Sequence, residues 1–361
     1  MTARPRRPIR TFLTAALTVL LVSAAVTVLF DPFYHYHKPL PGLKAVLMDK
    51  EYQCVGTLRH FNYDTVILGS SVMENTNLAT TNALFGGQSI KAIRSFGRVA
   101  DLAWFASEAF ASGNTIRRVI WNIDPGTLST TAQTSFAETG CPMYLYDHNP
   151  FNDLPYLWNK TVLLQKIPYE IAQSFSASHD ENNPYSWAQW KEFSEETSLA
   201  NYRRRRDPLP EQSPDAYAAE LQGNLSLLCD IIEAHPETEF IFSYPPYSLL
   251  YWDSRARDGA LTLTLAQAQE TARTLLRYDN VRFYCFLDDL EIVTDLEWYL
   301  DSLHYAPEIN TRMLETMAHG GHALTTDNLD AVFDALTDFA ANKVPGLLVP
   351  YEEAGRFIYD D

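Results

Sequence analysis

Five short apolar runs alternate with segments of helical spacing between residues 65 and 341. The runs cover residues 65–68, 90–96, 117–123, 240–243 and 281–286. They are rich in β-branched and aromatic residues, and turn residues such as glycine and proline follow them, which predicts buried strands. The first run stops at Gly69 and the second at Gly97.

The segments between these runs repeat apolar residues with the period of an α-helix. They cover residues 99–112, 213–235, 261–278, 307–318 and 327–341. In the first of them Leu102, Phe105 and Ala109 fall on one helical face. Strands that alternate with helices through short connections predict a central parallel sheet with helices on both faces, a three-layer α/β/α domain.

The amino-terminal 30 residues have a different pattern. Residues 11–30 form an uncharged run of about the length that spans a bilayer as a helix. Four arginines precede it: Arg4, Arg6, Arg7 and Arg10. They predict a cytoplasmic amino terminus and an extracytoplasmic remainder, a single-pass protein of the cell membrane. A cleaved signal peptide is the alternative, because residues 23–25 are small. The run continues past them to Phe30, which favours an uncleaved anchor.

The predicted domain organisation follows from these patterns. Residues 1–30 form the cytoplasmic tip and anchor, and residues 31–60 a juxtamembrane linker rich in proline and aromatics. Residues 61–345 form the α/β domain, interrupted by an insertion at 126–210, and residues 346–361 form a carboxyl-terminal tail. His35 and His37 in the linker could bind metal, but two histidines without a third ligand favour the simple linker.

Charge narrows the choice of partners. The net charge is −17. Without the four arginines of residues 1–30, a segment that holds no acid, 24 basic residues face 45 acidic ones, a net charge of −21. This balance predicts no nucleic-acid binding. It also predicts repulsion from anionic lipid head groups, so that membrane contact depends on the apolar helix.

The four cysteines do not indicate a metal site, because no two are at Cys-x-x-Cys spacing. Cys229 and Cys285 lie in apolar surroundings typical of a core. Cys54 and Cys141 lie in loop-like surroundings and could pair in an oxidising compartment, although the sequence does not fix connectivity.

Two stretches carry candidate chemistry. Ser70 and Ser71 directly follow Gly69, at the carboxyl end of the first predicted strand, where open α/β sheets place their ligands. The alternative is that they only cap the next helix. Late in the chain Asp301 precedes His304 by three residues. A serine nucleophile needs a base, and the base needs a third group to orient it, so the two stretches together indicate a catalytic constellation.

These stretches resemble the SGNH (GDSL-like) hydrolase superfamily, whose first block is Gly-Asp-Ser or Gly-Ser-Ser and whose last block is Asp-x-x-His. The resemblance covers roughly residues 60 to 320, apart from the insertion. It implies that Ser71 is the nucleophile, His304 the base and Asp301 its partner. It also implies an SGNH/flavodoxin-like fold and an extracytoplasmic serine esterase or O-acyltransferase that works through an acyl-serine. No metal or organic cofactor is implied.

The resemblance places the oxyanion hole at Ser71, Gly97 and the third block, normally Gly-x-Asn-Asp. Here that block reads Asn122-Ile123-Asp124-Pro125, which puts Asp124 where the asparagine belongs. A carboxylate there would oppose an oxyanion. Asn122 is the substitute candidate, but neighbouring side chains on a strand point to opposite faces, which argues against it.

Related anchored proteins, including the D-alanyl-transfer protein of lipoteichoic acid synthesis, are similar in layout. The resemblance therefore implies a cell-envelope polysaccharide or teichoic-acid-like substrate and, as one option, a membrane-bound O-acyltransferase partner. The alternative is a catalytically inactive envelope scaffold with the same fold. The insertion is a candidate lid. The run Arg203 to Arg206 is either a solvated turn or a clamp for an anionic polymer.

Overall fold

The computed structural model describes residues 6–176 and 180–360, so Arg4 of the predicted cytoplasmic tip lies outside the described residues. The chain divides into two compact units. The helical unit comprises Met1–Phe61 and Ala137–Glu181, and the sheet unit comprises Asn62–Phe136 and Asn182–Asp361. The chain passes between the units at residues 61–62, 136–137 and 181–182, and the last two places fall inside the predicted insertion.

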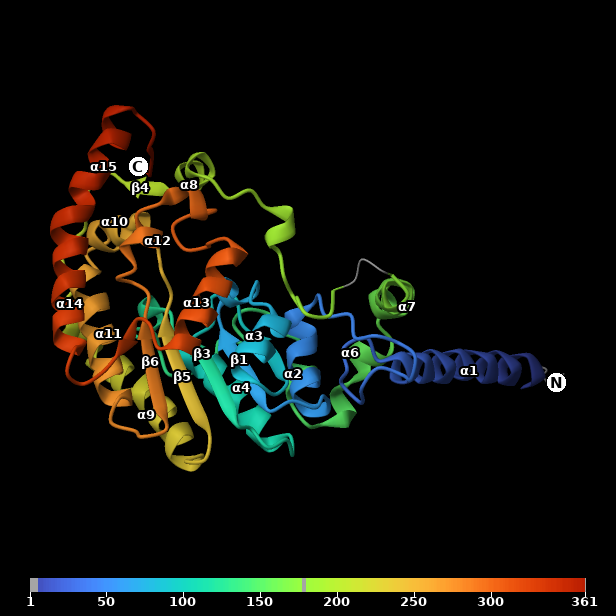
Figure 1. The fold of residues 1–361 in the computed structure, drawn as a ribbon. Helices are drawn as coiled ribbons and strands as arrows, with labels where there is room; N and C mark the ends of the chain where they lie inside the picture. The colour runs from blue at the N-terminus through green and yellow to red at the C-terminus, as the bar shows by residue number, and fades with distance from the viewer. Residues whose placement is uncertain (1–5, 177–179, 361) are drawn as a thin grey trace. The chain divides into compact units, whose positions relative to one another are not determined.

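The sheet unit contains a six-stranded sheet in the order β2-β1-β3-β5-β6-β7. Its strands are β1 (Thr65–Gly69), β2 (Ser89–Ile93), β3 (Arg118–Asn122), β5 (Glu239–Tyr244), β6 (Val281–Cys285) and β7 (Ala323–Leu324). All pairs are parallel except β6 with β7 (Figure 1). The predicted α/β fold with a central, mostly parallel sheet is confirmed, and β1 is buried along its whole length, which explains its continuous apolar run.

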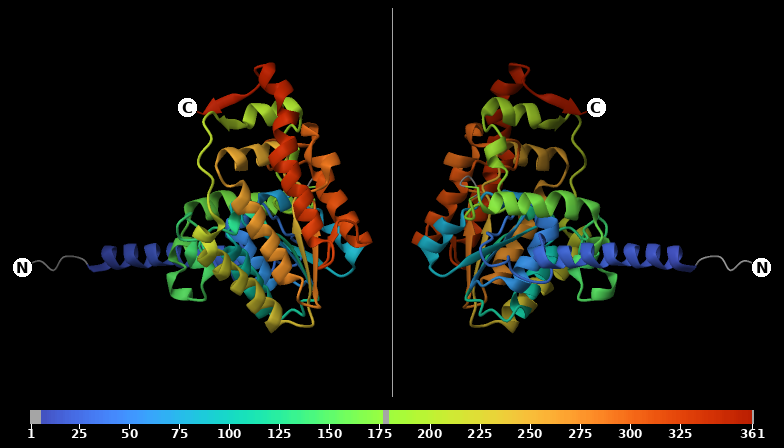
Figure 2. Two further views of the ribbon diagram at one scale, coloured as in Figure 1. Left: turned by 90° about the vertical axis from the view of Figure 1, so that its left-hand side faces the viewer. Right: turned by 90° about the vertical axis from the view of Figure 1, so that its right-hand side faces the viewer.

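Helices flank this sheet on both faces (Figure 1, Figure 2). The helices of this unit are α3 (Leu78–Phe85), α4 (Val99–Ala111), α8 (Glu195–Asn201), α9 (Ala218–Ala234), α10 (Leu249–Arg257), α11 (Leu261–Leu275), α12 (Leu290–Val293), α13 (Pro307–His319), α14 (Leu329–Asp338) and α15 (Val344–Glu353). Helix α4 packs on α9 and α9 on α11, whereas α3 packs on α13. This grouping is the one that right-handed crossovers produce, because the chain reverses direction across the sheet after β2.

The predicted tail and the arginine run belong to one small structure. Residues 344–353 form α15, and β8 (Ile358–Asp360) pairs in parallel with β4 (Arg203–Arg205). The side chain of Arg204 is buried, and its Nε lies 2.8 Å from Asp253 Oδ2. Arg205 pairs with Asp258 at 2.8 Å. Three of the four arginines thus form a strand, and the charges of Arg204 and Arg205 are compensated within the chain.

The helical unit contains α1 (Arg6–Phe30), α2 (Lys50–His60), α5 (Met143–Tyr146), α6 (Leu154–Leu157), the π-helical turn η4 (Val162–Lys166) and α7 (Ile167–Ser174). The predicted apolar amino-terminal helix is confirmed, and its segment Pro8–Phe30 is long and apolar enough to cross a membrane. The predicted linker is more ordered than its composition suggests, because it contains α2. All four cysteines lie within the described residues and are free thiols, so no bond joins Cys54 to Cys141.

Candidate active site

The turn that follows β1 depends on Gly69. A Cβ atom added there would lie 2.5 Å from Cγ of Met73 and 3.3 Å from Cβ of Asn122. A side chain would therefore force the turn apart. The chain continues into the short 3₁₀ helix η1 (Ser71–Met73), which presents Ser71 at the carboxyl edge of the sheet.

Ser71, His304 and Asp301 form a continuous chain of hydrogen bonds. Oγ of Ser71 lies 2.7 Å from Nε2 of His304, although 233 positions separate them in the sequence. Nδ1 of His304 lies 2.8 Å from Oδ2 of Asp301. The structure therefore brings together the three residues that the sequence predicted as nucleophile, base and orienting acid, at distances suitable for proton transfer.

Asp301 also shapes the loop that carries the histidine. Its second oxygen, Oδ1, accepts the backbone N–H groups of Leu303 and His304, each at 2.8 Å. Burial acts to raise the pKa of Asp301, but these amides and the imidazole outweigh it and hold the pKa below its ordinary value. An ionised Asp301 favours the tautomer with the proton on Nδ1, which leaves the Nε2 lone pair directed at Ser71.

Gly97, predicted as an oxyanion donor, is satisfied within its own turn. Its N–H donates to the carbonyl of Arg94 at 2.9 Å. A Cβ atom at Gly97 would lie 2.8 Å from that carbonyl oxygen, so the tight turn requires glycine in any case. The neighbouring Phe96 has a φ of 53° and is 86% exposed. The structure gives Gly97 a role in shaping the loop after β2.

Asn122 ends β3 and is fully buried beside Gly69. Its Nδ2 lies 3.5 Å from both oxygens of Ser243, contacts at the outer limit of a hydrogen bond. Among the described residues its Oδ1 has no hydrogen-bond partner. The amide of Asn122 is thus weakly held.

Asp124 lies next to the nucleophile turn. It accepts hydrogen bonds from the hydroxyl groups of Tyr247 and Ser70. Burial raises the pKa of Asp124 above its ordinary value, while the two hydroxyls and the charge of His304 act in the opposite direction. The residue that occupies the asparagine position of the resembled block therefore lies beside the nucleophile turn and is hydrogen-bonded to it through Ser70.

Trp187 contacts both ends of the Ser71–His304 pair, which the sequence did not predict. Its Nε1–H donates to the backbone carbonyl of Ser71 at 3.2 Å. Its ring meets the imidazole of His304 edge-on, with 5.3 Å between centroids. Asn75 holds this segment in place, because its Oδ1 accepts the backbone N–H groups of Trp187 and Ala188 at 3.2 Å.

Asn310 joins the two stretches from the other side. It lies on α13, which begins three residues after His304. Its Nδ2 donates to the carbonyl of Val72 at 2.8 Å and lies 3.3 Å from Oγ1 of Thr76. Because Val72 follows the serine, this bond fixes the nucleophile turn to the element that carries the base. The Asn310 side chain had no recognisable signal in the sequence.

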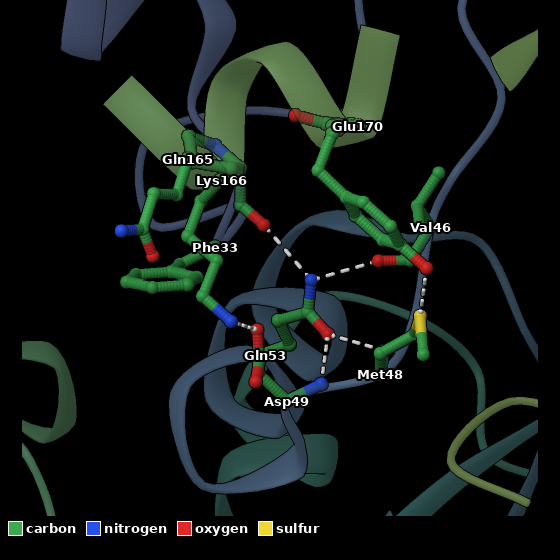
Figure 3. A pocket seen from close by; sticks show the side chains of 10 residues that line it. Phe33, Val46, Met48, Asp49, Gln53, Gln165, Lys166 and Glu170 are labelled. Carbon is green, nitrogen blue, oxygen red and sulfur yellow. Dashed lines mark hydrogen bonds and ion pairs between the residues drawn. The ribbon is translucent and has the colours of Figure 1, made fainter. Parts of the chain in front are cut away.

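A separate cavity of about 350 Å³ lies within the helical unit. Figure 3 shows Gln53 inside it, where the side chain bonds to the backbone of Pro32, Val46, Met48 and Asp49 at 2.8–2.9 Å. Lys166 and Asp49 form an ion pair of 2.5 Å at its wall. None of the three predicted catalytic residues lines this cavity. The polar groups of Gln53 are satisfied by the fold.

Comparisons with known proteins do not identify a family for this chain. No protein-family model and no curated protein matches the chain. One solved structure, described as "a putative platelet activating factor" from Streptococcus pneumonia, aligns with 78% of this chain and 91% of its own at 10% identity, with a TM-score of 0.40. Similarity at this level carries no argument about function, which has to come from the site itself.

Proposed function

We propose that the sheet unit is a serine esterase or O-acyltransferase of the SGNH type. The observation that carries this proposal is the 2.7 Å contact between Ser71 Oγ and His304 Nε2, backed by Asp301 at 2.8 Å. Packing alone does not require that the two ring nitrogens of a histidine bond to a serine on one side and to an acid on the other. Such an arrangement is what activates a serine hydroxyl.

The proposed reaction has two halves. Oγ of Ser71 attacks the carbonyl carbon of an ester, and His304 Nε2 takes the hydroxyl proton. The tetrahedral intermediate collapses, the alcohol leaves with the proton returned by His304, and an acyl-serine remains. A water molecule or an acceptor hydroxyl then attacks the acyl carbon and gives its proton to His304. The bond from the acyl carbon to Ser71 Oγ breaks, the carboxylic acid or the new ester leaves, and His304 returns the proton to Oγ.

The proposed setting is the cell envelope. An uncleaved α1 would anchor the protein in the cell membrane with the site outside the cytoplasm, and the substrate would be an acylated or acylatable envelope polysaccharide or teichoic-acid-like polymer. A membrane-bound O-acyltransferase is the proposed partner. The acidic surface, with a net charge of −17, agrees with the proposed absence of nucleic-acid substrates.

The intact mass of the purified full-length protein after incubation with a small activated acetyl ester tests this proposal. We expect a transient adduct of one acetyl group that disappears as the ester is consumed. The Ser71→Ala protein should form no adduct. A wild-type protein that forms no adduct and does not turn over the ester would favour the inactive scaffold, with polymer binding as its measurable property.

Substitution of Asp124 by asparagine should raise the activity, whereas substitution of Ser71 should lower it strongly. Asp124→Asn keeps an acceptor for Tyr247 and removes the negative charge next to the developing oxyanion. Ester turnover at neutral pH should rise about tenfold, equivalent to about 1.4 kcal/mol of barrier. Asp124→Ala is the matched control, because it removes the charge but also the hydrogen bonds, and it should not gain activity. A tenfold loss in Asp124→Asn would show that the ionised carboxylate assists the base.

Trp187 should affect the rate through the position of Ser71 and His304. Trp187→Phe retains the edge-on ring contact and loses the bond to the Ser71 carbonyl, so kcat should fall less than tenfold. Trp187→Ala loses both, about 1 kcal/mol each, and kcat should fall about 30-fold. Steady-state kinetics with a small ester measure this, since KM for such a substrate should stay nearly constant. Equal kcat values in both variants would contradict this role.

A further inference from the structure

The helical unit exposes large apolar side chains along residues 151–175. They lie in or directly after the 3₁₀ turn η3 (Pro150–Asn152), α6, η4 and α7, and their exposed fractions are Phe151 86%, Leu154 53%, Trp158 41%, Leu164 66% and Phe175 75%. Single apolar side chains are ordinary on protein surfaces, so these five gain meaning only from what lies beside them. We call this group the apolar face.

The segment that bears the apolar face is attached to α1. Nε1–H of Trp158 donates to the backbone carbonyl of Leu20 at 2.8 Å, and the hydroxyl of Thr27 donates to the carbonyl of Leu157 at 3.1 Å. Both α6 and η4 pack on α1. Leu20 lies ten residues before the end of the helix at Phe30, a distance of about 15 Å along its axis. The segment therefore runs beside the carboxyl-terminal half of the apolar helix.

The turn after α1 fixes this arrangement. Asp31 is buried and accepts the backbone N–H groups of His35, Tyr36 and His37 at 2.7–3.0 Å. It also accepts the hydroxyl of Tyr156, on α6, at 2.6 Å. The turn after α1 and the contacts of Thr27 and Leu20 thus join this helix to α6.

The charged side chains of residues 151–175 are buried, paired or long enough to reach water, so they are compatible with an apolar environment. Asp153 is buried and lies 2.9 Å from the hydroxyl of Tyr36, and Glu170 is buried and accepts the hydroxyl of Tyr34 at 3.0 Å. Lys166 is paired with Asp49. Lys160 is the remaining charge in this range, on a long side chain that can extend its ammonium group toward water.

We propose that the apolar face is embedded in the lipid bilayer beside α1, in the leaflet at the carboxyl-terminal end of that helix. Continuity selects the bilayer over a protein partner, because the face adjoins a helix of membrane-spanning length whose own surface is exposed. The negative net charge rules out attraction by anionic head groups as the driving force, so binding depends on buried apolar area. Removal of α1 near residue 25 would also remove the Leu20 carbonyl that holds Trp158, so the same inference requires an uncleaved α1.

Site-directed spin labelling of the full chain in phospholipid nanodiscs tests this proposal. Nitroxides are attached to Leu164→Cys and Phe175→Cys in a Cys229→Ser background, because the other three native thiols are buried. Leu17→Cys on α1 is the control for lipid, and Glu237→Cys on the sheet unit is the control for water. All four labelled side chains are exposed in the structure, so labelling should not disturb the fold.

The expected result is that labels at 164, 175 and 17 are reached by dissolved oxygen and protected from a water-soluble nickel chelate, while the label at 237 shows the reverse. Accessibility of 164 and 175 to nickel while 17 remains protected would overturn the proposal. Shielding of both labels from oxygen and nickel alike would indicate a protein partner or a second copy instead. Exposure of the label at 17 to nickel would overturn it as well, because α1 would then lie outside the bilayer. None of these outcomes depends on catalytic activity.

Discussion

Ser71→Ala should lower ester turnover by several orders of magnitude and abolish covalent labelling by a fluorophosphonate. His304→Ala should have a similar effect, since Ser71 Oγ and His304 Nε2 share one 2.7 Å hydrogen bond and act as a unit. The serine hydroxyl is a poor nucleophile until the imidazole accepts its proton. The double variant should therefore be hardly worse than either single variant, and kcat of the three proteins measures this directly.

Ser70→Ala is the matched control for this experiment. Ser70 is adjacent in sequence and buried, and its hydroxyl bonds to Asp124 instead of to the histidine. Its loss should change kcat less than tenfold while labelling of Ser71 continues. Labelling of Ser71→Ala at the wild-type level, or loss of labelling in Ser70→Ala alone, would show that Ser71 is not the nucleophile.

Asp301→Asn should cost about 10³- to 10⁴-fold in kcat, the second largest effect. Asparagine can still accept the backbone N–H groups of Leu303 and His304, so the loop should keep its shape. Its NH₂ group, however, would face Nδ1 and favour the opposite tautomer, in which Nε2 carries the proton and cannot accept one from Ser71. The pH profile of kcat should reveal this as a loss of the activity near neutral pH.

Comparison of Asp301→Ala with Asp301→Asn separates two roles of Asp301, the orientation of the His304 ring and the stabilisation of the loop. Asp301→Ala removes the two loop hydrogen bonds as well as the bond to the ring, so it should lower the thermal unfolding temperature, whereas Asp301→Asn should change it little. The lowered pKa of Asp301 determines how the stability of the protein changes with pH. Its contribution to stability is present above about pH 4 and is lost as the pH falls through the folded-state pKa. A wild-type unfolding temperature that is as insensitive to acid as that of Asp301→Ala would contradict this assignment.

The central layers of the fold could be predicted from the sequence because their burial is nearly complete. Strand β1 is an unbroken apolar run, and α4, α9 and α11 have one apolar face each. The pairing of β4 with β8 could not be predicted, because a run of three arginines has no apolar strand pattern. The burial of Arg204 depends on its ion pair with the distant Asp253. Such a strand forms because of its contacts with residues far away in the sequence.

The candidate site was predictable to a similar extent. Residue type and spacing identified Ser71, Asp301 and His304, since the acid and the base lie on one loop and the serine ends a strand. The positions of Trp187 and Asn310 depend on contacts with segments about 120 and 240 positions away. No local pattern encodes contacts of that range. The same holds for the helical unit, which combines residues 1–61 with 137–181 and thereby places half of the predicted insertion beside the amino-terminal helix.

Fluorophosphonate labelling of the full-length protein, followed by identification of the modified peptide by mass spectrometry, tests the central claim most directly. The hydrogen-bonded chain from Asp301 through His304 to Ser71 predicts one modified residue, Ser71, and no modification after His304→Ala. A wild-type protein that is folded, accessible to the probe and unmodified would contradict the claim, as would modification at any other serine.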